Sequence, residues 1–284
     1  MKTFSKMKIF LSASLSLAMI SCGSMLDPSA GLEANEKSYV GMPAMAASTP
    51  LLFVTFEKNY GAYTEAMMQG DFNSLSSSAG LRAGRGQIFL NNGWRVLQVR
   101  YPVNAFDSPG SGVLFRAPLA ASDELYYQVK VYFNHDFEWV KTGKLTGLAG
   151  GSIPAGGEPD PNGFSCRFLW KTDGVAALYL YHSEQTGTYG DVLPFTVPFK
   201  RSAWQTLRMR VKLNTPGVAN GSLQAWMDGV QVYSKTNFRF RQAGATWKID
   251  TFLFDTFYGG ADASFAPTQH DNFACFDDVR IWKP

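Results

Sequence analysis

Two short segments of the sequence alternate apolar side chains with groups that can bind an anion or move a proton. Ser165 and Arg167 stand between the apolar residues of the first run. Tyr179 and Tyr181 do the same in the second run, which follows after the hairpin-length link 171–175. Successive side chains of a strand point to opposite faces, so joining the two apolar faces as a core leaves these four side chains on one surface. Such a surface can grip a carboxylate with a guanidinium fork and move protons with phenols.

Other charged residues of similar spacing have plainer explanations. Arg208, Arg210 and Lys212 alternate with apolar residues, which is typical of the solvated outer face of a sheet. Residues 238–241 have the same pattern and receive the same interpretation. His182 falls on the same face as the alternating apolar residues of its strand, so we expect a buried histidine with its hydrogen bonds satisfied. The two tyrosines, taken alone, would also suit an ordinary cross-strand aromatic surface.

Glycines surround Lys144 in the segment 141–151. A phosphate-binding loop requires Gly-Lys followed by Ser or Thr at the start of a helix, whereas here Leu145 follows Lys144. We therefore interpret 141–151 as a flexible glycine-rich loop beside the tyrosine face. Its backbone would let a long ligand approach closely.

The cysteines and histidines form no recognisable metal motif. There is no CxxC pair, and the three histidines are scattered, so we expect neither a metal nor a cofactor. Cys166 has the inward parity of its strand. In an exported protein it could pair with Cys275, or both could be small buried apolar residues.

The elements that must position these groups are predicted to be β-strands. Aromatic and β-branched runs recur from residue 51 onward, separated by Gly, Asn, Asp and Pro, and no long stretch has helical periodicity. Asp228-Gly229 marks a hairpin, and 63–68 is the one weakly helical segment. The sequence therefore predicts an all-β sandwich with Phe164, Phe168, Trp170, Leu178 and Leu180 inside. The predicted strands span 51–56, 94–99, 125–133, 164–170, 176–181, 207–213, 223–227, 230–233, 249–257 and 276–282.

The N-terminus is interpreted as an export signal. Three lysines precede the apolar run 9–20, which is too short to span a membrane, so residues 1–21 are predicted to be a signal peptide. Residues 19–22, Met-Ile-Ser-Cys, resemble a lipobox in which Cys22 is lipidated, although Leu is usual where Met19 stands. The alternative is cleavage beyond Cys22. Residues 22–49 are predicted to form a flexible tether, and the protein to be an outer-membrane lipoprotein or a secreted or periplasmic one.

The charge balance excludes nucleic acid as the main partner. The chain of 284 residues has 26 Lys and Arg against 23 Asp and Glu. Three of those cations lie in the export signal, so the remainder is neutral and any affinity for an anion must come from a local cluster.

Several motifs follow one another in a fixed order along the chain. They are Gly-Lys-Leu-x-Gly-Leu-x-Gly-Gly at 143–151, Gly-Phe-Ser-x-Arg-x-x-Trp at 163–170, Tyr-x-Tyr at 179–181, Leu-Asn-Thr-Pro-Gly at 213–217, Asn-Gly at 220–221, Trp-x-Asp-Gly at 226–229 and Phe-Tyr-Gly-Gly at 257–260. Together they resemble the alginate and glucuronan lyases of polysaccharide lyase families 14 and 20, over about residues 51–282. The sequence departs from them at Thr146, where Pro is usual, and at Lys171, where Arg is frequent.

The resemblance implies a single jelly-roll domain over residues 50–284, with an acidic polysaccharide lying along a concave sheet. It implies that Lys144, Tyr179 and Tyr181 transfer protons or neutralise charge, and that Ser165 and Arg167 hold the uronate. β-Elimination needs these groups, because the proton at C5 is poorly acidic and the developing charge must be neutralised. We expect a monomer that acts without a cofactor. The choice of base among the three, and of the polyuronate, stays open.

Two other functions fit a jelly roll. One is a carbohydrate-binding sandwich without catalysis, since a fold does not by itself imply an activity. The other is a glycoside hydrolase, which needs two carboxylates about 5–9.5 Å apart. The best match, at residues 158–160, has Gly163 where the second Glu is required, so hydrolysis ranks last. The lyase and the binding module differ in whether Lys144, Arg167 and the two tyrosines meet in one cleft.

Overall fold

Two antiparallel sheets hold about half of the described residues, which are 49–284 except 92 and 109 in a computed structural model. The strands of the larger sheet are β1 (Leu52–Val54), β2 (Gly61–Ala62), β3 (Gly86–Asn91), β4 (Trp94–Tyr101), β6 (Glu124–Phe133), β11 (Trp204–Lys212), β12 (Gly221–Met227), β13 (Val230–Phe238) and β15 (Asn272–Trp282). Those of the smaller sheet are β5 (Val113–Ser122), β7 (Thr142–Gly151), β8 (Gly163–Lys171), β9 (Ala176–Tyr181), β10 (Asp191–Pro194) and β14 (Ile249–Tyr258).

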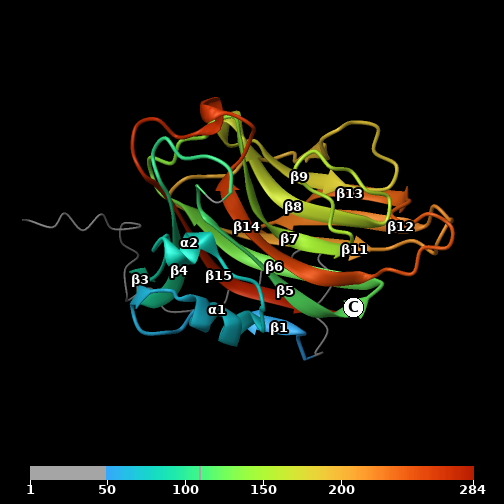
Figure 1. Cartoon of the computed structure of the whole chain (residues 1–284), viewed down its shortest axis with the longest axis horizontal. Coiled ribbons are helices and arrows are strands. Elements are labelled where there is room, and N and C mark those ends of the chain that lie inside the picture. The colour runs from blue at the N-terminus through green and yellow to red at the C-terminus, as the bar shows by residue number, and fades with distance from the viewer. Residues whose placement is uncertain (1–48, 92, 109) are drawn as a thin grey trace, which may run out of the picture.

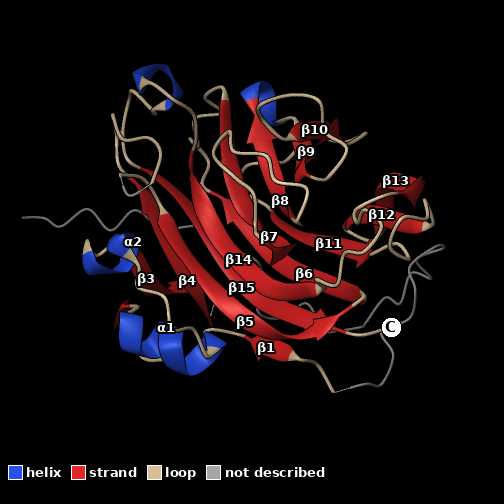
Figure 2. Cartoon of the chain, turned by 45° about the vertical axis from the view of Figure 1, so that its right-hand side comes forward, coloured by secondary structure: helices blue, strands red, loops and turns tan. Residues whose placement is uncertain are grey.

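The two sheets pack face to face, which confirms the predicted jelly-roll sandwich (Figures 1 and 2). The larger sheet runs β13-β12-β11-β6-β15-β4-β3-β2, with β1 beside β15. The smaller sheet runs β10-β9-β8-β7-β14-β5. The hairpin predicted at Asp228-Gly229 joins β12 to β13, and both turn residues have positive φ angles, as this tight turn requires.

Alternation along the strands places the core between the sheets. The five side chains predicted to be inside are all buried in it: Phe164, Phe168, Trp170, Leu178 and Leu180. Burying one such side chain contributes about 1.5–3 kcal/mol. The core therefore fixes which faces of β8 and β9 point away from it.

The pairing of β8 with β9 confirms the predicted shared face. Ser165 lies opposite Tyr181, and Arg167 lies opposite Tyr179. Directly opposed side chains project to the same side of a sheet. The four polar groups therefore lie on the outer side of the smaller sheet, as expected.

The segment predicted to be a flexible glycine-rich loop is a strand, β7, between β8 and β14. Glycine is required at several positions of β7 because neighbouring atoms occupy the space of a side chain. A Cβ atom on Gly143 would lie 1.9 Å from the ring of Trp170, and one on Gly147 would lie 1.9 Å from the carbonyl oxygen of Cys166. The pairing of β7 with β8 shifts register between Lys144 and Gly147. Composition mimicked a loop because neighbouring groups leave no room for side chains.

Two short helices, α1 (Glu65–Phe72) and α2 (Ala79–Arg82), lie beside the sandwich (Figure 2). The weak helical signal at 63–68 corresponds to the start of α1. Thr64 caps this helix by accepting a hydrogen bond from the amide of Met67 at 3.2 Å. Phe72 anchors its other end in the core by stacking on Phe252 at 5.7 Å.

The solvated-face interpretation of β11 is wrong for Arg208. Its side chain is on the outer face, but it is buried, with Nη2 donating to Gln128 at 2.8 Å and the guanidinium 5.3 Å from the ring of Trp282. Arg210 donates to Glu124 at 2.7 Å, and only Lys212 is exposed. Long cationic stems lie along aromatic neighbours on this face instead of extending into water.

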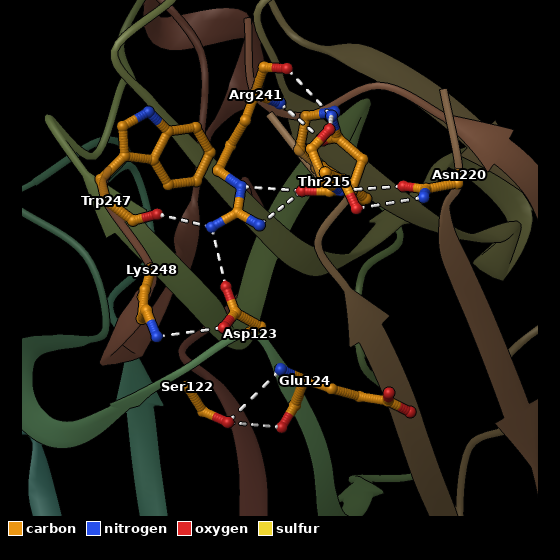
Figure 3. A network of polar contacts seen from close by, with 10 residues as sticks. Ser122, Asp123, Glu124, Thr215, Asn220, Arg241, Trp247 and Lys248 are labelled. Atoms are coloured by element: carbon orange, nitrogen blue, oxygen red, sulfur yellow. Dashed lines mark hydrogen bonds and ion pairs between the residues drawn. The ribbon is translucent and has the colours of Figure 1, made fainter. Parts of the chain in front are cut away.

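The same interpretation fails at Arg241, which is buried in a polar network between strands (Figure 3). Its guanidinium bonds Asp123 at 2.8 Å and the carbonyl oxygen of Trp247 at 3.1 Å. Arg239, by contrast, makes a partly exposed pair with Glu184 at 2.7 Å. Sequence alternation located these arginines on a face but could not show which segments cover that face.

The two cysteines of the described region lie on opposite sides of the larger sheet. Cys166 lies in the core between the sheets, whereas Cys275 packs outside it with Val96 and Tyr132. They form no disulfide with each other. The predicted signal 1–21, Cys22 and nearly all of the predicted tether lie outside the described residues. Within the part of the chain that is described, no helix is long and apolar enough to cross a membrane.

Candidate active site

A cleft of about 870 Å³ crosses the outer side of the smaller sheet. Each of the six strands contributes at least one side chain to it, so the cleft runs across the strands, over a width of about 24 Å at the usual strand spacing. The strand residues used below are Arg116 (β5), Asp255 (β14), Lys144 (β7), Arg167 (β8), Tyr179 (β9) and Val192 (β10). Such a shape suits an extended ligand.

Lys144 is half-buried in the floor of this cleft, where rings confine its amine. Nζ lies 5.5 Å from the ring centre of Tyr179 and 5.2 Å from that of Phe257. Gly259 makes room for it, since a Cβ atom there would lie 2.4 Å from Nζ. Burial, followed by the positive charge of Arg167, lowers the pKa of Lys144 to about 8. An amine with this pKa is partly neutral near pH 8 and can accept a proton.

Arg167 forms a buried ion pair with Asp255, with Nε and Oδ2 3.1 Å apart. Burial raises the pKa of Asp255, and the positive charges of Arg167, Arg116 and Lys144 oppose that rise. Asp255 was not among the predicted site residues. A signal existed, because an acidic residue interrupts the apolar run 249–257 with the parity that faces away from the core.

Tyr179 lines the cleft, but Tyr181 is buried beneath it. Their hydroxyl oxygens are 3.2 Å apart. The Tyr181 hydroxyl also accepts from the amide of Gly157 at 2.8 Å, and that of Tyr179 accepts from the amide of Gly190 at 3.3 Å. Burial and the contact with Tyr181 raise the pKa of Tyr179, and these effects outweigh the opposing charge of Arg167. Tyr179 therefore keeps its proton and suits the role of an acid.

Ser165 does not reach the cleft, in contrast to the prediction that it holds the ligand. It is buried, and its hydroxyl donates to the carbonyl oxygen of Pro154 at 2.6 Å. The segment 152–158 therefore covers Ser165 on the face where parity had placed it. Ala155 and Gly156 of that segment line the cleft in its place.

His182 is buried and satisfied, as expected. Its Nε2 lies 2.8 Å from a carboxylate oxygen of Asp191, and its ring packs on Phe238 at 4.9 Å. It does not line the cleft. Across the described residues, no group of three metal-ligating side chains comes together.

The charge of the cleft is locally positive. Lys141, Lys171 and Arg116 line it together with Lys144 and Arg167, against two carboxylates, Asp107 and Asp255. This is the local cluster that a nearly neutral chain needs to attract an anionic polymer. An extended cationic cleft with an amine of lowered pKa and a tyrosine hydroxyl suits an enzyme that acts on an anionic polymer.

Comparison with known proteins agrees with the site. The family model of polysaccharide lyase 14 matches residues 90–279. The chain belongs to this family and is a polysaccharide lyase. A search of curated protein sequences gave no match.

Solved structures show the same fold. A substituted form of alginate lyase Aly36B, in complex with alginate trisaccharide, is 25% identical, with a TM-score of 0.72 over 84% of this chain and 100% of that one. The PL-14 alginate lyase from Aplysia kurodai is 22% identical, with a TM-score of 0.72 over 84% and 100%. An endo-β-1,4-glucuronan lyase from the fungus Trichoderma reesei is 11% identical, with a TM-score of 0.50 over 83% and 96%.

Proposed function

We propose that this polysaccharide lyase cleaves a polyuronate of the alginate class by β-elimination. The observation that carries the proposal is that Lys144, Arg167 and Tyr179, from three adjacent strands, line one cleft. The cationic lining supports an acidic polymer as the substrate. The alginate trisaccharide bound by Aly36B supports alginate as the first polyuronate to test.

In the proposed reaction each group has one task. The terminal nitrogens of Arg167 bind the uronate carboxylate and neutralise the charge that develops on it. The neutral amine of Lys144 takes the C5 proton, and the hydroxyl of Tyr179 gives its proton to O4. The C5–H and C4–O4 bonds break, their electrons form the C4=C5 double bond and leave with O4, and two chains result.

Lys144 is the better candidate base because the two pKa shifts have opposite signs. The pKa of Lys144 is lowered to about 8, which makes the unprotonated amine available near neutral pH. The pKa of Tyr179 is raised by burial, which keeps its hydroxyl protonated. Tyr181 supports Tyr179 from below through the contact between the hydroxyls.

The test is the absorbance of the unsaturated uronate formed by wild type on alginate, glucuronan and a neutral glucan. We expect signal on a polyuronate and none on the glucan. Lys144→Ala should lose the signal, while Lys212→Ala, which removes an exposed lysine from the other sheet, should keep it. Binding of polyuronates without any double-bond formation by wild type would contradict the lyase and favour the carbohydrate-binding alternative.

We also propose that the enzyme is exported and anchored by lipid on Cys22. The basic start, the short apolar run and the cysteine directly after it support this. Metabolic labelling with a fatty acid should mark wild type and not Cys22→Ser. Equal labelling of both would contradict the anchor.

A further inference from the structure

Asp255 is a buried carboxylate in the cleft floor that the proposed reaction does not use. It lies on β14, on the same side as Phe257, and its Oδ2 is 3.1 Å from Nε of Arg167. Both side chains are almost inaccessible, at 4% for Arg167 and 10% for Asp255. Neither residue contributes to the apolar core between the sheets.

The contact uses one edge of the Arg167 guanidinium. Within the described part of the chain, the guanidinium makes no other ion pair and no hydrogen bond, so Nη1 and Nη2 remain for a ligand. A guanidinium recognises a carboxylate through a planar fork, and the plane must be fixed for both bonds to form. The Nε–Oδ2 contact is an ion pair without hydrogen-bond geometry, so Asp255 holds the guanidinium on its Nε side by charge and leaves the fork unoccupied.

We propose that Asp255 is a positioning residue: it holds Arg167 by its Nε edge, so that the terminal nitrogens face the uronate carboxylate when the C5 proton leaves. The inference rests on the proposed function. Asp255 itself touches neither the uronate nor the proton, and it acts through Arg167.

The charge of Asp255 also bears on Lys144. The groups around that amine are Arg167 from β8, Asp255 from β14, Tyr179 from β9 and Asp107 from the segment before β5. Arg167 favours the neutral amine, whereas Asp107 and Asp255 favour the protonated amine. Removing either carboxylate should therefore move the acid limb of the pH–rate profile to lower pH.

A double-mutant cycle tests whether Asp255 acts through Arg167. The variants are Asp255→Asn, Arg167→Gln and the two combined, and kcat/KM is measured on a polyuronate at a pH above the acid limb. We expect Asp255→Asn to lose about 10-fold and Arg167→Gln about 100-fold, the latter as for one transition-state donor. The combined variant should have the same kcat/KM as Arg167→Gln, because removing Asp255 has no further effect once the guanidinium that it positions is absent. Additive losses would overturn the proposal.

Asp107→Asn is the matched control. It removes the same charge from the same cleft, but no contact joins Asp107 to Arg167 among the described side chains. We expect its effect to be the same in wild type and in Arg167→Gln, and its acid limb to move to lower pH. An acid limb unmoved in Asp255→Asn would contradict the effect of its charge on Lys144, whereas the positioning of Arg167 is decided by the cycle.

Asp255→Asn leaves a buried charge without its partner and could fail to fold. The comparison of Arg167→Gln with the combined variant still decides the question, because the combined variant contains neither charge. Equal kcat/KM in these two supports the proposal, and a tenfold lower value in the combined variant overturns it. Wild type without activity on any polyuronate would instead reject the proposed function, so the two failures are distinguishable.

Discussion

Two buried arginines, each paired with an aspartate, lie in different surroundings. Arg241 uses every part of its guanidinium: Nε and Nη2 donate to the carbonyl oxygen of Asn214. Nη1 donates to Asp123 and to the carbonyl oxygen of Trp247 (Figure 3). Among the described residues, the guanidinium of Arg167 has one ion pair, with Asp255, and its side chain lines the cleft. A guanidinium whose donors are all hydrogen-bonded within the protein stabilises the fold, whereas one with free donors is available to a ligand.

The aspartates differ in the same way. Burial raises the pKa of Asp123, but hydrogen bonds from Lys248 and Arg241 outweigh it, so the pKa is lowered overall. For Asp255, burial outweighs the opposing cations and the pKa is raised. The first pair is fully compensated within the fold. In the second pair, the charge of Arg167 is not fully compensated by Asp255 and is available to an anionic substrate.

The largest effect is expected at the structural arginine. Arg241→Ala removes four hydrogen bonds from a buried network and should lower the free energy of unfolding by about 3–5 kcal/mol. Urea denaturation measures this. The folded fraction should keep its kcat, and a variant as stable as wild type would contradict the comparison.

Arg167→Ala should reverse the pattern. We expect kcat/KM on the polyuronate to fall about 10²–10³-fold, because the developing charge loses its partner. Its unfolding midpoint should stay closer to wild type than that of Arg241→Ala. Steady-state kinetics and urea denaturation of the same preparations check both parts. A loss of stability as large as at Arg241, with kcat/KM retained, would show that Arg167 stabilises the fold and does not act on the substrate.

Lys144→Met should trade activity for stability in a pH-dependent way. The pKa of Lys144 is about 8 in the folded protein and near 10.5 when unfolded, so holding its proton costs folding free energy. The cost is present in full below pH 8 and fades as the pH rises to 10.5. The variant should be about 1–3 kcal/mol more stable at pH 7, with a smaller gain at pH 10. Urea denaturation at both pH values checks this, and a gain independent of pH would contradict it.

The smallest effect is expected at Tyr181. Tyr181→Phe removes one acceptor from Gly157 and one contact with Tyr179, worth about 1 kcal/mol, and kcat should fall about five- to tenfold. Tyr179→Phe should fall about 10²-fold, because it removes the proton donor itself. Kinetics of the two variants side by side checks the order. A larger loss at Tyr181 would place that hydroxyl, not Tyr179, at the reaction.

The parts of the molecule governed by alternation could be predicted from the sequence. Parity placed Arg167 and Tyr179 on one face, because a buried face forces every second side chain outward. The predictions for Ser165 and Tyr181 were right about the face and wrong about access. The segments that cover them, including 152–158, have no periodicity that sequence analysis could detect.

Two other features were hidden for different reasons. β7 looks like a loop because its glycines accommodate neighbouring strands and rings, a tertiary requirement that composition does not reveal. In the sequence, Asp255 is an acidic residue in an otherwise apolar strand with no evident partner, and only the structure shows its ion pair with Arg167. The motifs therefore pointed to Lys144, the amine that we propose as the base, but only packing brought Asp255 beside Arg167.

The central claim, that the neutral amine of Lys144 takes the C5 proton, is tested most directly by the pH dependence of kcat/KM on the cleaved polyuronate. This quantity reports the ionisations of the free enzyme. We expect a rise of about tenfold per pH unit at low pH that levels off near pH 8, the pKa of Lys144. A rise that continues without a bend beyond pH 10 would contradict it and assign the base to a tyrosine.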